Sequence, residues 1–187
     1  MLFRSDFGIA NLTRMNAGVA VIAVADGKVL RGRDGVSDVL IANQAEKAAV
    51  QGTECGNGLV IDHGNGWTAQ YCHLRKGSVV NKPGTSVKKG MVLGMVGSSG
   101  LASFPHVHLT IRYQDKVVDP FVGVNDSKSC AIVREPLWSM PVGYVPTGLV
   151  SAGFTANPPT ALEIWQGKHE NKSLDRQLDC RHAVLLH

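Results

Sequence analysis

The chain has 187 residues, a net charge of +4, and hydrophobic residues at 44% of its positions. This length predicts one domain, or one domain with a small addition, and the hydrophobic share is enough for a globular core. The positive charge is mild and forms no basic block, which argues against nucleic acid as a partner. No apolar run reaches membrane-spanning length, and the first residues lack the apolar segment of a secretory signal.

The first third of the chain predicts strands and one polar insertion. A weakly helical segment at residues 12–15 precedes an apolar run at residues 19–24. A turn signal at residues 25–28 and a second strand at residues 29–32 follow, which predicts a β-hairpin. Residues 38–54 are rich in Ala, Gln, Glu and Lys and are predicted to form a polar surface insertion with one helical turn.

Strand signals become dense after residue 55. Residues 58–62 and 67–72 have strand patterns and are joined by the turn signal His-Gly-Asn-Gly at residues 63–66, which predicts a second β-hairpin. His63 is placed in this turn, where we expect a structural or solvent-facing role. His73 comes at the end of the return strand and is the stronger functional candidate.

Four cysteines occur without a C-x-x-C pair, as suits two disulfides in an oxidising compartment or, alternatively, four buried thiols. Cys55 and Cys72 lie at nearly equal distances from the predicted turn. Antiparallel pairing would bring them close to opposite one another, so we predict a disulfide between them. Cys130 with Cys180 is a weaker second prediction, because nothing local fixes their geometry.

Glycine turns alternate with short apolar strands over residues 82–97, a pattern typical of small β-sandwiches and barrels. Residues 98–100 are predicted to form a flexible loop. A turn at residues 114–116 and a strand at residues 117–121 are predicted to end the β-domain. From about residue 125, prolines and aromatic residues become frequent, which predicts a second, smaller β-rich unit without a catalytic signature.

The His-x-His motif at residues 106–108 is the strongest functional signal in the chain. Alternating residues from Val107 predict a strand that starts just after Pro105. Residues two apart on a strand project from the same face, so His106 and His108 should point the same way. Two adjacent imidazoles suit a metal ligand with a second histidine for acid–base chemistry. From this motif alone, packing or hydrogen bonding on a sheet face is an equal alternative.

Several spaced motifs together resemble the lysostaphin-like, or LytM-type, zinc metallopeptidases. They are Tyr-Cys-His-Leu at residues 71–74, Pro-Gly at residues 83–84, the glycines that follow, and Pro-His-Val-His-Leu at residues 105–109. The resemblance covers about residues 2–121, and we expect a metallopeptidase domain at residues 1–124 and an accessory region at residues 125–187. It implies an all-β duplicated hybrid motif fold with a groove, and a periplasmic or secreted location.

The resemblance also implies the chemistry and its residues. The family cleaves peptide bonds of bacterial peptidoglycan and holds Zn²⁺ with His-x-x-x-Asp and the second histidine of His-x-His. Carried onto this sequence, Asp6 and His108 are the implied metal ligands. His73 and His106 are the implied catalytic histidines, and a peptidoglycan peptide is the implied partner.

The sequence departs from the family pattern at the first metal ligand. The position four residues before Asp6 is Leu2, and Arg4 stands where the family has glycine. Leucine has no lone pair, so two protein ligands remain of the usual three, and weak zinc binding is expected. One interpretation is an active peptidase whose N-terminus is truncated in this chain.

A second interpretation is a non-catalytic LytM-like module that binds peptidoglycan or activates a cell-wall amidase. A lipoyl-like or biotinyl-like carrier, or a sugar-phosphotransferase module, is a distant third, since no lysine is clearly placed in a carrier hairpin and a carrier needs no His-x-His. We favour peptidase chemistry, because the histidines would have no use in a pure binder.

Overall fold

The computed structural model describes residues 5–124 and 135–139. This part of the chain contains nine strands and two short helices. In chain order they are β1 (Ser5–Gly8), α1 (Leu12–Ala17), β2 (Ala20–Ile22), β3 (Gly27–Arg33), α2 (Gln44–Ala49), β4 (Asn57–Gly64), β5 (Trp67–Leu74), β6 (Ser86–Val87), β7 (Val92–Met95), β8 (His106–Tyr113) and β9 (Lys116–Val118). Neither helix in these two ranges is long and apolar enough to cross a membrane.

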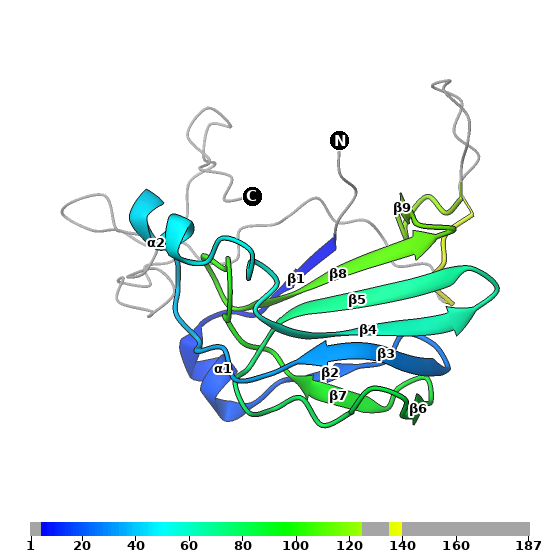
Figure 1. Cartoon of the computed structure of the whole chain (residues 1–187), viewed down its shortest axis with the longest axis horizontal. Coiled ribbons are helices and arrows are strands. Elements are labelled where there is room, and N and C mark those ends of the chain that lie inside the picture. The colour runs from blue at the N-terminus through cyan, green and yellow to red at the C-terminus, as the bar shows by residue number, and fades with distance from the viewer. Residues whose placement is uncertain (1–4, 125–134, 140–187) are drawn as a thin grey trace, which may run out of the picture.

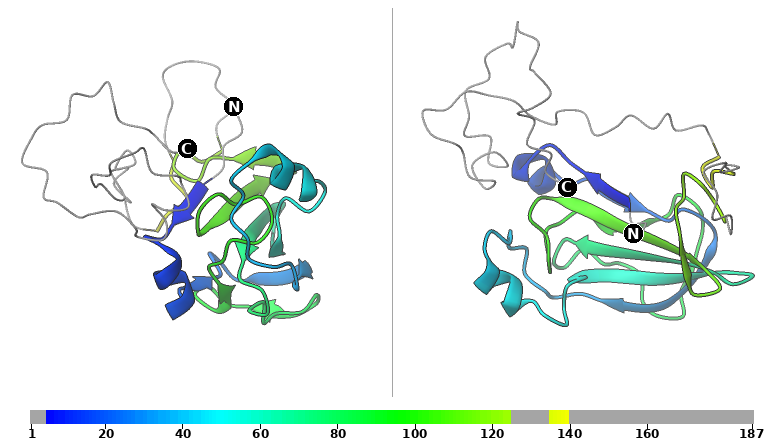
Figure 2. Two further views of the ribbon diagram at one scale, coloured as in Figure 1. Left: turned by 90° about the vertical axis from the view of Figure 1, so that its left-hand side faces the viewer. Right: turned by 90° about the horizontal axis from the view of Figure 1, so that it is seen from above.

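A large antiparallel sheet forms the body of the domain (Figure 1). Its strands follow the order β1-β8-β5-β4-β3-β6, and β9 also pairs with β8. β2 and β7 form a separate two-stranded sheet. The structure thereby confirms the all-β fold class, with the two helices lying toward the end of the large sheet where β8 begins (Figures 1 and 2).

The hydrophobic core lies between the large sheet and the β2–β7 pair. Register places Tyr71 opposite Leu109, and both are buried in the core together with Val21 from β2. The Tyr71 hydroxyl accepts a hydrogen bond of 2.9 Å from the Val24 N–H, which ties the two sheets together. Burial raises the pKa of Tyr71 to about 12, so this hydroxyl stays protonated at neutral pH.

The hairpin predicted over residues 19–32 is wrong. β2 pairs with β7, whereas β3 pairs with β4 and β6. The Asp26 carboxylate in the connecting turn instead accepts hydrogen bonds from the Lys89 N–H and the Lys88 ammonium group, at 2.8 and 2.7 Å. Val21 and Val29 are both buried between the two sheets. Burying apolar residues from two facing sheets outweighs the local turn signal.

The second predicted hairpin is confirmed, with a shorter turn. β4 and β5 pair along their length, and only Asn65 and Gly66 lie between the strands. Both have positive φ, 51° and 83°, as a two-residue turn that follows the twist of the strands requires. His63 belongs to β4 and not to the turn, and its Nδ1 lies 2.8 Å from the Asp26 carbonyl oxygen.

Residues 98–100 are not a flexible loop, contrary to the prediction. Ser98 and Ser99 are only 1% and 0% exposed. The Ser99 hydroxyl donates to the Leu74 carbonyl oxygen at 2.7 Å and accepts from the Asn57 N–H at 2.9 Å. The Ser98 N–H donates to Asp38 at 2.8 Å. These bonds satisfy the buried polar groups and fix the segment before β8.

The polar insertion carries one short helix, as predicted. α2 has no buried residue, and its N-cap Asn43 accepts a hydrogen bond from the Glu46 N–H. Such a cap satisfies one of the free N–H groups of the first turn. α1 is capped in the same way by Asn11, which accepts from the Arg14 N–H.

Residues 135–139 pack against the β-domain. The Trp138 ring lies 6.0 Å from the Phe7 ring and 5.5 Å from the Phe121 ring, measured between centroids. The Leu137 N–H donates to the Pro120 carbonyl oxygen at 2.9 Å. The rest of the C-terminal unit expected at residues 125–187, and the pairing of Cys130 with Cys180, lie outside the described residues. The boundary after residue 124 stays a prediction.

The predicted disulfide between Cys55 and Cys72 is present. Their Cα atoms lie 4.8 Å apart, and the bond joins the segment before β4 to the end of β5. It closes a loop with a sequence separation of 17 residues. A cross-link of this kind stabilises the fold mainly by restricting the unfolded chain.

We expect the double variant C55S/C72S to lose about 3 kcal/mol of unfolding free energy, the amount predicted for a loop of this size. Urea denaturation of the oxidised protein and the variant measures the difference. Peptide mapping without reductant should recover residues 55 and 72 in one linked fragment, which checks that the bond is formed in the sample. Equal urea midpoints would contradict a stabilising role.

Candidate active site

Three histidines from two neighbouring strands meet on one face of the large sheet. β8 begins with His106 and carries His108, and β5 carries His73 near its end. The His73 ring lies 4.6 Å from the His106 ring and 5.9 Å from the His108 ring, measured between centroids. One nitrogen atom of each ring lies within 4.8 Å of the others. The expectation that these three side chains converge is confirmed.

β1 brings Asp6 to the same place. Register places Asp6 opposite His108, and Asp6 Oδ1 lies 2.6 Å from His108 Nδ1 and 3.7 Å from His106 Nε2. Partial burial raises the pKa of Asp6, but the hydrogen bond and positive charge of His108, with smaller contributions from the other two histidines, lower it overall. The three predicted histidines therefore gather beside the ionised carboxylate of Asp6, the fourth predicted site residue.

Backbone carbonyl groups fix the rings of His73 and His106. His73 Nδ1 lies 2.8 Å from the Ser99 carbonyl oxygen, and His106 Nδ1 lies 2.8 Å from that of Phe104. A carbonyl oxygen only accepts, so each Nδ1 must carry the proton and donate. The lone pair of the neutral ring is then on Nε2. Each of these two histidines can offer that lone pair to a proton or a metal.

Burial keeps the same two imidazoles neutral. His73 is 6% exposed and His106 is 4% exposed. Burial, reinforced by the neighbouring charge of His106, lowers the pKa of His73 to about 4. Burial also lowers the pKa of His106 below its ordinary value. At neutral pH both rings are proton acceptors and not cations.

His73 reaches this face through an unusual backbone conformation. Register places Cys72 opposite His108, so a regular strand would direct the next side chain to the other face. His73 has a φ of 62°, in the left-handed region, and leaves the alternation of β5. Its N–H donates to the Cys55 carbonyl oxygen at 2.9 Å. The segment that the disulfide links to β5 therefore holds the backbone of His73.

Three residues that contact the site histidines and hold their rings are not identified from the sequence. Thr110 Oγ1 lies 3.1 Å from His108 Nε2. Thr110 is two positions beyond His108 on β8, so the strand period already applied to His-x-His could have identified it. Ser99 and Phe104 act through backbone carbonyl groups, which no side-chain pattern marks. The Phe104 ring also stacks on His106, with centroids 4.3 Å apart.

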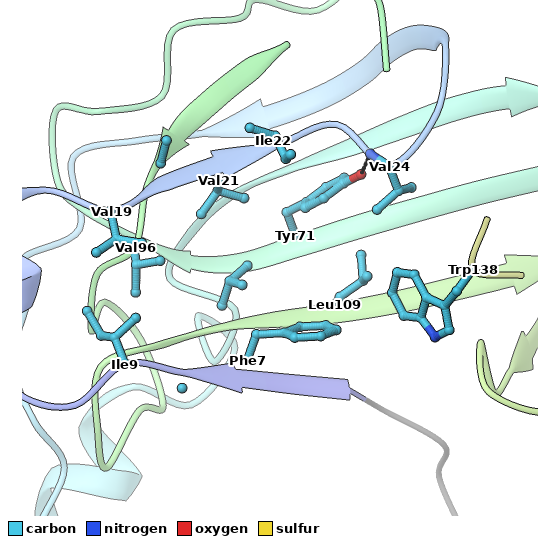
Figure 3. A pocket seen from close by; sticks show the side chains of 13 residues that line it. Phe7, Ile9, Val19, Val21, Ile22, Val24, Tyr71, Val96, Leu109 and Trp138 are labelled. Atoms are coloured by element: carbon cyan, nitrogen blue, oxygen red, sulfur yellow. Dashed lines mark hydrogen bonds between the residues drawn. The ribbon is translucent and has the colours of Figure 1, made fainter. Parts of the chain in front are cut away.

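An apolar pocket of about 250 Å³ lies on the opposite face of the sheet (Figure 3). Val107 and Leu109 line it, and they alternate along β8 with His106 and His108. Figure 3 shows Phe7, Leu109 and Tyr71 on neighbouring strands around this space. Among the described residues that line the pocket, Tyr71 alone has an ionisable side chain. The histidine face, and not this pocket, is the candidate for chemistry.

The donor groups on the histidine face are of the kind that zinc binds. Zinc is held by imidazole nitrogen and carboxylate oxygen atoms, and these must be deprotonated. Asp6 is ionised, and His108 places a ring nitrogen directly beside it. These two residues therefore fit a zinc site as neighbouring ligands. Leu2, at the position of the first ligand in the motif, lies outside the described residues.

Curated proteins resemble part of this chain. The cell division protein DipM of Caulobacter vibrioides is 31% identical over 115 residues, which are 62% of this chain and 17% of DipM. The peptidoglycan DD-endopeptidase ShyB of Vibrio cholerae is 34% identical over 64 residues, which are 34% of this chain and 15% of ShyB. The matched region is thus less than a fifth of either relative.

This chain also resembles a solved structure and matches a family sequence model. The catalytic domain of the antimicrobial peptidase lysostaphin from Staphylococcus simulans aligns with 64% of this chain and 76% of that domain, at 23% identity and a TM-score of 0.45. The sequence model described as "Peptidase family M23" matches residues 10–120. This range contains His73, His106 and His108, and Asp6 lies just before it. Because the match covers more than half of the chain, this protein belongs to peptidase family M23.

Proposed function

We propose that this protein is a zinc-dependent endopeptidase that hydrolyses peptide cross-links of bacterial peptidoglycan. The gathering of Asp6, His73, His106 and His108 on one sheet face is the observation that carries the proposal. Membership of the M23 family supports peptidase chemistry. Peptidoglycan as the substrate is supported by ShyB, a peptidoglycan DD-endopeptidase, and by the DD-carboxypeptidase/endopeptidase Mpg of Neisseria meningitidis, 37% identical over 65 residues.

Asp6 and His108 are the residues that would hold the metal. When bound, zinc lowers the pKa of its water ligand and polarises the scissile carbonyl group. Thr110 contacts His108 Nε2 and so restrains the orientation of its ring. Partners of this kind around a metal-binding histidine set its tautomer and its basicity.

His73 and His106 would carry the proton transfers. Each is neutral and has its Nε2 lone pair free of the backbone bond that holds Nδ1. One ring accepts the proton of the attacking water, and the resulting cation is a strong acid, because burial disfavours its charge. That proton can pass to the leaving amine. A neutral ring whose Nδ1–H is held by a backbone carbonyl has no donor at Nε2, so stabilisation of the developing oxyanion falls to the ring that carries the transferred proton on Nε2.

The disulfide supports a periplasmic or secreted location. Cys55 and Cys72 are bonded within the region that matches the family. Disulfides persist in oxidising compartments and are rare in the cytosol. A periplasmic or secreted location would place the proposed enzyme together with its proposed substrate, bacterial peptidoglycan.

A second candidate function is a non-catalytic LytM-like module that binds peptidoglycan or activates a cell-wall amidase. Leu2 is the observation that favours it, because this position should hold the first zinc ligand. A catalytic zinc normally keeps three protein ligands and an open position for water. A carrier function conflicts with the family match.

The variant Leu2→His tests the two functions against each other. We expect the unmodified chain to bind well under one zinc per chain and to digest cell walls weakly, since Asp6 and His108 supply two ligands. Leu2→His restores a donor at the spacing of the motif. Elemental analysis should then show close to one zinc per chain, and a cell-wall digestion assay should gain a signal that a chelator removes.

Leu2→Phe is the matched control, because phenylalanine supplies a ring without a ligand nitrogen. His108→Ala in the Leu2→His background should abolish both gains. Stoichiometric zinc and full digestion by the unmodified chain would contradict a site with only two ligands. Another residue would then supply the third, and His169, His182 and His187 are the unassigned histidines.

The roles of His73 and His106 are tested separately from metal binding. In the Leu2→His background, we expect His73→Ala or His106→Ala to lower kcat by about 10²–10⁴-fold, the usual contribution of a general acid or base. Zinc content should stay near one per chain. His63→Ala is the control, because His63 contacts the Asp26 carbonyl group and lies outside the cluster. Loss of zinc with either variant would show that the substituted histidine is a metal ligand and would contradict its role in proton transfer alone.

A further inference from the structure

The face that carries the histidines continues along β5 and β8 as a row of polar residues. Register pairs Cys72 with His108, Gln70 with Thr110, and Thr68 with Arg112. Residues two apart on a strand share a face, so all of these side chains lie on the same side as His108. The residues between them on β8, such as Leu109 and Ile111, point into the core. A polar surface therefore extends from the candidate active site.

Arg112 is a cation of this row and has no charged partner among the described residues. It is half-buried, and its Nη1 donates to Gln70 Oε1 at 3.1 Å. A guanidinium group has five N–H donors. Within residues 5–124 and 135–139, no carboxylate lies within ion-pair distance of it. Asp62, which pairs with Thr68 on the same face, accepts from the Gly64 N–H instead.

Gln70 orients this guanidinium group. The Gln70 Nε2 atom lies 3.4 Å from Cys72 Sγ and 3.6 Å from Cys55 Sγ. The amide is therefore held with its nitrogen toward the disulfide and its oxygen toward Arg112. Within the part of the chain that the structure describes, a neutral partner fixes this half-buried side chain and most of its N–H donors make no hydrogen bond. Such a group is preorganised for an anionic ligand.

We propose that Arg112, oriented by Gln70, binds a carboxylate of the peptidoglycan stem peptide. The choice of ligand rests on the proposed function, because that function makes an acidic cell-wall peptide the occupant of this face. A guanidinium group matches a carboxylate with two parallel hydrogen bonds. Arg112 lies four positions beyond His108 on β8, about 13 Å along the strand. An extended peptide covers that distance in about four residues.

The subsite makes the protein selective for the free acid. Conversion of a carboxylate to an amide removes the negative charge and one of the two acceptor atoms. A charge-assisted bond exceeds a neutral one by enough to change affinity about tenfold. Stem peptides with free carboxyl groups should therefore bind better than their amidated counterparts.

The test measures peptide binding without hydrolysis. The metal-free, unmodified chain is titrated by NMR with a synthetic stem tetrapeptide that has free carboxyl groups, and with the same peptide fully amidated. We expect about tenfold weaker binding of the amidated peptide. Arg112→Gln should bind both peptides with the weaker affinity. Arg112→Lys should keep part of the preference, because it retains the charge but loses the paired donors.

Arg14→Gln is the matched control, since it removes the same charge from the exposed surface of α1. It should bind like the unmodified chain. Equal affinity for the two peptides, no binding of either, or an equal loss with Arg14→Gln would each overturn the subsite. The comparison of the two peptides on the unmodified chain does not depend on a variant that folds.

This outcome is separable from that of the proposed function. A chain that prefers the free acid through Arg112 but digests no cell wall, even with Leu2→His, keeps the subsite and loses the hydrolase. A Leu2→His variant that digests cell walls, while the unmodified chain does not distinguish the two peptides, keeps the hydrolase and loses the subsite.

Discussion

The antiparallel register of β8 against β1 and β5 is the constraint on which the rest of the structure depends. Along β8 the side chains alternate, so that His106 and His108 share one face while Leu109 and Ile111 enter the core. A slip of one residue would exchange the two faces. Burial of the apolar set therefore fixes the position of the histidines. Core packing and site geometry are two consequences of one register.

His73 reaches the same face only because its backbone departs from the alternation of β5, and the surrounding chain stabilises this conformation. A left-handed residue other than glycine costs roughly 1–3 kcal/mol and persists where its surroundings determine it. Here the Cys55 carbonyl group holds the His73 N–H, and the Ser99 carbonyl group holds its ring. Gly56 follows Cys55 and has a φ of 61°, and an added Cβ would clash with the Ser99 carbonyl group. The disulfide, the glycine and the buried serine act together on one side chain.

Local signals in the sequence were enough to predict part of the fold and of the candidate site. The Asn65–Gly66 turn and the period of β8 identified the central hairpin and the His-x-His strand. The hairpin over residues 19–32 failed because its strands pack from two facing sheets, a long-range effect that no local turn signal reports. Residues 98–100 are predicted to form a flexible loop, and no local pattern indicates that Ser99 is buried. Its burial depends on Asn57 and Leu74, which are distant in sequence.

The proposed peptide recognition and the proposed hydrolysis depend on different parts of the same face. In the proposed site, Leu2 takes the position of a metal ligand and leaves Asp6 and His108 in place. The polar row from Gln70 to Arg112 is built on β5 and β8 and is anchored by the disulfide, so it does not need the metal to form. The buried imidazoles of His73 and His106 are neutral bases, and their desolvation is of use for proton transfer rather than for binding. A chain that lacks the first ligand of the motif thus retains the polar row that we propose binds a cell-wall peptide, together with two neutral imidazoles that can accept protons.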